Sequence, residues 1–129
     1  EILGEVDYYL GVGARLSLDE LAVEIHRFGG LFVPAHVERD MFSLTSQLGF
    51  IPEADYDALE LSRNYPLREH PAVGSFLQNH DLPLICGSDA HYLEDIGRAG
   101  TEIECSRRSA REVLDAVRLG HCRPVFRRT

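Results

Sequence analysis

Two short segments of this sequence place cation-binding side chains shortly after an apolar run. His36 follows the run Leu31–Ala35, and Asp89 and His91 come soon after the run Leu82–Cys86. In an extended segment, residues i and i+2 project to the same side, so Asp89 and His91 can face one cation together. A carboxylate with two neutral imidazoles is a mixed oxygen and nitrogen ligand set that suits Zn, Mn or Fe. The sequence therefore holds two candidate cation-binding segments.

Each segment also has an ordinary structural interpretation. A lone histidine after a strand is more often hydrogen-bonded within the fold than bound to a metal, and Asp89 would serve equally well to cap a helix or a turn. The coincidence of two such segments at the ends of two apolar runs favours the functional interpretation of His36, Asp89 and His91.

Helical and strand patterns alternate along the chain. Ser17 and Glu20 form a capping box before a helical apolar pattern that ends at Gly29-Gly30. A second capping box is predicted at Ser109 and Glu112. The predicted helices cover residues 18–28, a segment from Pro71 to Asn79, and 110–119, and the predicted strands cover 31–35, 58–61, 82–86, 101–105 and 122–126.

This alternation predicts an α/β fold with a mostly parallel sheet. In such folds the loops after the strands open on one face, where the functional residues gather. We therefore expect His36, Asp89 and His91 to share that face. Glu60, at the end of another predicted strand, belongs to the same face and would support the ligands there.

Length and composition limit what the chain can be. It has 129 residues, 44% of them hydrophobic and 26% charged, which predicts one globular domain over residues 1–129. A complete (β/α)₈ barrel needs about 250 residues, so a chain of this length excludes a full barrel. The net charge of −8 argues against an electrostatically driven nucleic-acid or membrane-surface binder. No apolar run approaches the roughly 20 residues that span a bilayer.

The cysteines and histidines outside the two segments have structural interpretations. Cys86, Cys105 and Cys122 lie in or beside predicted strands and lack any CxxC spacing, which predicts buried, reduced thiols and a cytoplasmic location. His26, His70, His80 and His121 could each pair with a nearby carboxylate. The chain also opens on Glu1 without an initiator methionine, which favours a piece of a longer protein.

Three stretches of the sequence resemble the carboxy-terminal half of a PHP (polymerase and histidinol phosphatase) domain. They are GGLFVPAH at 29–36, DALELSRN at 57–64 and LPLICGSDAHYLEDIG at 82–97, and the resemblance extends over residues 17–126. It implies part of a distorted (β/α)₇ barrel with two or three divalent metals, Zn, Mn or Fe, in the complete domain.

The same resemblance implies a metal-dependent phosphoesterase in which a metal-activated water hydrolyses a phosphoric ester. His36, Asp89 and His91 would be metal ligands, and Arg39 is a candidate phosphate clamp through its guanidinium fork. The alternative for Arg39 is an ion pair with Glu38 or Asp40. A phosphorylated small molecule or a nucleic-acid end would be the substrate.

The sequence also departs from the family pattern, because the amino-terminal His-x-His motif is absent. We therefore expect the chain alone to bind metal weakly and to need the missing amino-terminal segment of the domain for activity. One alternative is a non-catalytic PHP-like scaffold or partner-binding module. A further alternative is another barrel metallohydrolase of the amidohydrolase type. Asp95, in the loop after His91, has no spacing that assigns it a role.

Overall fold

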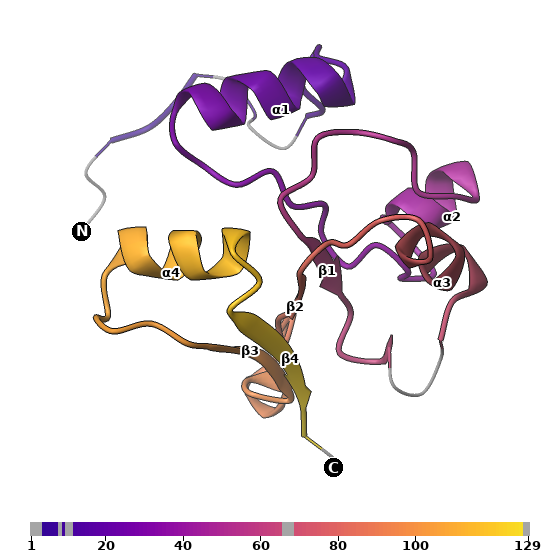
Figure 1. Ribbon diagram of the computed structural model, residues 1–129. Helices are drawn as coiled ribbons and strands as arrows, with labels where there is room; N and C mark the ends of the chain where they lie inside the picture. Colours follow the sequence, from indigo (N-terminus) through magenta and orange to yellow (C-terminus); the bar gives the residue numbers. More distant parts are fainter. Residues whose placement is uncertain (1–3, 8, 10–11, 66–68, 128–129) are drawn as a thin grey trace.

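The computed structural model describes residues 4–7, 9, 12–65 and 69–127, and Figure 1 shows the arrangement of their helices and strands. Short helices surround four short strands, with α2 and α3 on one side of β1 and α4 on the other side, near β3 and β4. In chain order the elements are α1 (Leu18–Arg27), α2 (Leu44–Leu48), β1 (Leu59–Leu61), α3 (Pro71–Leu77), β2 (Leu84–Cys86), a 3-10 turn (Leu93–Asp95), β3 (Ala99–Ile103), α4 (Ala110–Arg118) and β4 (Cys122–Phe126).

The helix ends largely follow the predicted local signals. The capping box at α1 is confirmed, because the Ser17 amide donates to the Glu20 carboxylate at 2.8 Å and the Glu20 amide donates to the Ser17 hydroxyl at 3.3 Å. Of the two hydrogen bonds that the capping box predicted at Ser109 and Glu112 requires, only one forms. Ser109 caps the Glu112 amide, but the Glu112 carboxylate accepts from the Arg107 amide at 2.8 Å instead of returning to Ser109.

Two segments differ from the sequence prediction. The helix α2 was not predicted, and its five residues are set by Ser43 at the amino end and by Gly49 in the left-handed region at φ 81°. Residues 31–35, predicted as a strand, form no regular strand, and Ala35 already belongs to a turn. Their backbone nevertheless bonds to β1, since the Asp57 amide donates to Phe32 and the Glu60 amide donates to Pro34.

The strands form two pairs of opposite sense. β1 and β2 are parallel, with Leu59, Glu60 and Leu61 opposite Leu84, Ile85 and Cys86. β3 and β4 are antiparallel, whereas the sequence predicted a mostly parallel sheet. The alternation of helices and strands does not reveal the direction of a strand, because that direction depends on the path of the connection between them.

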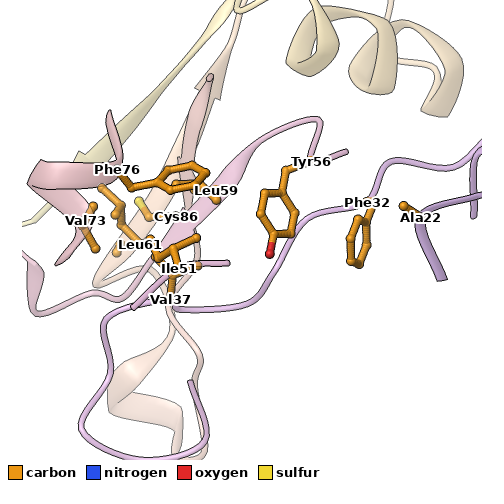
Figure 2. Close-up of a cluster of buried hydrophobic side chains, with 11 residues drawn as sticks. Ala22, Phe32, Val37, Ile51, Tyr56, Leu59, Leu61, Val73, Phe76 and Cys86 are labelled. Atoms are coloured by element: carbon orange, nitrogen blue, oxygen red, sulfur yellow. The ribbon is translucent and has the colours of Figure 1, made fainter. Parts of the chain in front are cut away.

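The hydrophobic core lies around β1 and connects the 32–37 segment with α3 and β2. Figure 2 shows Leu59 and Leu61 among the side chains of this cluster. Burying one such aliphatic side chain stabilises the fold by about 1.5–3 kcal/mol relative to exposing it. Among the described residues, the largest fully buried side chains are Leu59, Leu61, Val37 and Val73.

The three cysteines are free thiols, but only part of their predicted burial is confirmed. Cys86 is buried and Cys122 is half-buried, whereas Cys105 is exposed because it lies beyond the end of β3. Within the described part of the chain, no helix has the length and apolar character needed to cross a membrane.

Asp57 joins three parts of the fold through one carboxylate. It accepts hydrogen bonds from His26 on α1 at 2.7 Å, from the Phe32 amide at 2.7 Å and from Arg118 on α4 at 3.2 Å. Burial alone would raise the pKa of Asp57, but these hydrogen bonds bring the pKa below its ordinary value of 3.8. The predicted pairing of His26 with a carboxylate is thereby confirmed, as is that of His80, whose Nε2 lies 2.8 Å from Glu53.

Replacing Asp57 by Asn is expected to lower the free energy of unfolding by about 2 kcal/mol at neutral pH, because charged hydrogen bonds are lost. A carboxyl with a lowered folded pKa stabilises above pH 3.8, and that stabilisation is lost as the pH falls through the folded value. The difference in the free energy of unfolding between wild type and D57N, measured by urea unfolding, should therefore become smaller in acid. Asp55→Asn is the control, because Asp55 is 86% exposed and lies 3.5 Å from the same histidine. A gap that is equal at all pH values would contradict this account.

The hydroxyl of Tyr56 is buried without a hydrogen-bond partner. Its ring packs between Phe32, with centroids 5.3 Å apart, and Phe76, with centroids 6.3 Å apart. Burial, together with the negative charges of Asp19 and Glu53, raises the pKa of Tyr56 to about 12. The ring therefore stabilises the core while its hydroxyl destabilises it.

Tyr56→Phe is expected to raise the free energy of unfolding by about 1 kcal/mol, because a buried unsatisfied hydroxyl is removed and the ring contacts remain. Urea unfolding measures this change, and Tyr92→Phe, at a 71% exposed position, is the matched control and should have no effect. A destabilised Y56F would show that the hydroxyl has a partner.

Candidate functional site

The two candidate segments lie at the same end of adjacent parallel backbones. The 32–37 segment pairs with β1 on one side, where the Val37 amide donates to the Glu60 carbonyl at 2.9 Å. β2 pairs with β1 on the other side and leads into Gly87. Because these three backbones run in the same direction, the chain brings His36 and the 87–91 loop to one face, with β1 between them.

A contact between side chains connects the two segments directly. The Arg39 guanidinium donates to the Asp89 carboxylate, although the two residues are 50 positions apart in the sequence. The alternative pairing of Arg39 with Glu38 is not seen, because Glu38 is buried and accepts the Ser62 amide at 3.0 Å on both oxygens. Glu38 therefore fixes the loop after His36 to the end of β1, a role that no sequence signal indicated.

Two of the three predicted ligands have strained backbones. His36 has φ 29° and Asp89 has φ 45°, in the left-handed region that side chains other than glycine rarely adopt. Such conformations persist only where the surrounding structure imposes them, and they concentrate at functional sites. Their presence at both segments supports a common site.

The His36 imidazole has an unused donor or acceptor atom. Its Nδ1 is buried and has no hydrogen-bond partner, which is unusual for a polar atom inside a protein. The Glu60 carboxylate lies nearby, since Oε2 is 3.4 Å from the His36 amide nitrogen. The other oxygen of Glu60 lies 3.1 Å from where a Cβ on Gly87 would be, so this carboxylate extends from β1 toward the second segment.

The His91 imidazole is held in one tautomer when neutral. Its Nδ1 lies 2.9 Å from the backbone carbonyl of Asp89 and must donate to it, which leaves the Nε2 lone pair available to a cation. His91 is 65% exposed, and its Nδ1 is 4.0 Å from the Asp89 carboxylate. The ring is therefore anchored on its own loop and open to solvent.

Asp95 and Arg63 also belong to this end of the strands, although no motif or spacing indicated them. Arg63 Nη1 lies 2.9 Å from the Asp95 carboxylate and donates to the Ser88 carbonyl at 3.3 Å. The hydrogen bond from Arg63 lowers the pKa of Asp95, despite some burial, and the charge of Arg98 adds to this effect. A single acidic residue six positions after Asp89 carries no recognisable spacing signal.

The donor atoms at this face are of the right kind for Zn, Mn or Fe. They are an unpaired buried imidazole nitrogen on His36, a free imidazole lone pair on His91, and the carboxylates of Glu60 and Asp89. In residues 4–7, 9, 12–65 and 69–127, no group of three His, Cys, Asp or Glu residues is close enough together to hold a metal ion. The donor chemistry fits a metal, and the set of ligands is not closed by the residues described.

Comparison with known proteins finds a family match for one region of the chain. Residues 68–122 match the family model described as PHP-associated, which confirms the predicted resemblance over this region. The match contains Asp89, His91 and Asp95 and does not include His36 or Arg39. No curated protein and no solved structure matches the chain.

The strained backbone at Asp89 generates a test by substitution. Asp89→Gly is expected to be more stable than Asp89→Ala by about 1 kcal/mol, because glycine adopts φ 45° without steric penalty. Urea unfolding of both variants measures the difference. The same pair of substitutions at His91, which lacks a positive φ, should show the usual order with alanine more stable. Equal stabilities at Asp89 would contradict the strain.

Proposed function

From the PHP-associated character of residues 68–122, we propose that this chain carries part of the active site of a metal-dependent phosphoesterase. His36, Asp89 and His91 would bind the divalent cations. The observation that carries the proposal is the buried, unpaired Nδ1 of His36 at the same strand ends as Asp89. A polar atom that is buried without a partner is destabilising unless a ligand satisfies it.

The chain's own residues have separate tasks in this proposal. A bound divalent cation would supply a polarised phosphoryl oxygen and a water of lowered pKa. His91 offers Nε2 because the Asp89 carbonyl fixes its other ring nitrogen. Glu60 accepts the His36 amide and so supports the strained backbone of that ligand.

Arg39 is the residue that we assign to the phosphate. Its guanidinium has five N–H donors, and the contact with Asp89 leaves others free to bind phosphoryl oxygens. The Arg39 side chain is 37% exposed, so a substrate can reach it from solvent. The ion pair with Asp89 holds the guanidinium beside the carboxylate that would bind the cation.

The proposed substrate is a phosphorylated small molecule or a nucleic-acid end. The net charge of −8 disfavours long polyanions, which the protein would repel. A complete centre of two or three cations would need further ligands from an amino-terminal segment of the same domain, in a barrel-like arrangement. The three free thiols favour a cytoplasmic location.

Isothermal titration with Mn²⁺ tests the metal site. The wild-type chain is expected to bind Mn²⁺, and His36→Ala and Asp89→Asn should each weaken binding by at least about tenfold, because each removes a donor. His121→Ala is the control, since it removes an exposed imidazole that precedes β4 and lies outside residues 36–39 and 87–91.

The outcome also discriminates between the enzyme and the non-catalytic module. A wild-type chain that binds no Mn²⁺, or variants that bind as well as wild type, would overturn the proposed site. Either result would favour the PHP-like scaffold or partner-binding module as the function of this chain.

A further inference from the structure

Asp95 is buried, whereas residues 89–94 and Ile96 of the same loop are exposed. Its side chain is 8% exposed, whereas its neighbour Ile96 is 68% exposed and Leu93 is 85% exposed. An ionised carboxylate is seldom buried unless several donors compensate for its lost hydration. The groups that contact the Asp95 carboxylate therefore indicate its role in the loop.

The donors to Asp95 come from both ends of the loop and from β1. Arg63, directly after β1, lies 2.9 Å from the carboxylate, and Arg98, at the far end of the loop, lies 3.5 Å away. The backbone amide of His91 also contributes to lowering the pKa of Asp95. Asp95 thus connects Arg63, two residues after β1, with Arg98 at the far end of the loop.

Arg63 extends this arrangement to the other side of Asp89. The same guanidinium nitrogen that contacts Asp95 donates to the Ser88 carbonyl at 3.3 Å. The Ser88 hydroxyl donates to the Ala99 carbonyl at 3.0 Å and accepts the Gly97 amide at 2.8 Å. Ser88 is thus held in place on one side of the strained Asp89, and on the other side the His91 ring bonds to the Asp89 carbonyl.

We propose that Asp95 is a positioning residue that, together with Arg63, fixes the loop carrying Asp89 and His91 in the geometry that binds a divalent cation. This role rests on the proposed function. We assign Asp95 no direct contact with the cation, because its side chain is 8% exposed and its Oδ1 is shared by Arg63 and Arg98. Its effect on the cation is therefore indirect.

The physical reason lies in the backbone of Asp89. A φ of 45° at a residue other than glycine is unfavourable and relaxes when the surrounding constraints are removed. Relaxation would turn the Asp89 carboxylate away and separate it from His91. Residues that orient metal ligands in this way typically contribute 10–100-fold to metal affinity.

The test compares Asp95→Asn with Glu94→Gln by Mn²⁺ titration of the whole chain. Both variants lose one negative charge in the same loop, but Glu94 is exposed whereas Asp95 is buried. We expect D95N to bind Mn²⁺ about tenfold more weakly and E94Q to bind like wild type. Asp95→Glu keeps the carboxylate and should recover part of the lost affinity.

A second measurement separates positioning from simple stability. Amide hydrogen exchange is expected to accelerate at residues 89–91 in D95N and to stay unchanged in β1, whose Leu59 and Leu61 are fully buried. Circular dichroism at the titration temperature verifies that each variant is folded. If D95N does not fold, Arg63→Met removes one donor to the carboxylate and one to the Ser88 carbonyl, and the same affinity loss is expected.

The outcomes distinguish this role from the proposed function. A wild-type chain that binds no Mn²⁺ overturns the proposed function, and the role of Asp95 with it. A wild-type chain that binds Mn²⁺, alongside a folded D95N of equal affinity, overturns only the positioning role. Equal losses in D95N and E94Q would show a general charge effect and would also overturn it.

Discussion

The parallel pairing of backbones around β1 is the constraint on which the rest of the site depends. β1 has only three residues, yet it receives the 32–37 segment on one side and β2 on the other. Its side chains Leu59 and Leu61, two residues apart on the same face of the strand, lie in the centre of the core and hold this pairing in register. Because the three backbones run in one direction, polar residues 50 positions apart meet at their ends.

The carboxylates of this chain fall into two groups, those that hold the fold together and those that remain accessible at the candidate site. Asp57 connects α1, the 32–37 segment and α4, at a distance from the strand ends. Glu38 and Asp95 fix the loops that carry the candidate ligands, whereas Asp89 is partly exposed and paired with Arg39. Stability therefore comes from carboxylates whose bonds are satisfied within the fold, and the candidate site holds those that remain accessible.

Sequence patterns predicted the positions of the helices and strands better than the pairing of the strands and the contacts between side chains. The caps at Ser17 and Pro71 and the apolar runs of β1, β2 and β4 are local signals, and the structure confirms them. The antiparallel pairing of β3 with β4 and the contact of Arg39 with Asp89 depend on the path of the chain, which no local pattern specifies. Asp95 was not selected because its importance comes from Arg63, which is 32 positions away. The chemistry of His36, Asp89 and His91 and the support from Glu60 were predicted from residue type and position, whereas the contacts of Glu38 and Arg63 were found only in the structure.

We propose that the loop after residue 35 and the loop after Cys86 form one cation site. Paramagnetic broadening of amide resonances by substoichiometric Mn²⁺ tests this most directly, because broadening depends on distance from the bound ion. We expect the amides of residues 36–39 and 88–91 to broaden together, at the same Mn²⁺ concentration, before those of α1 or α4. Broadening of only one of these two segments, or of acidic surface residues elsewhere, would contradict the account.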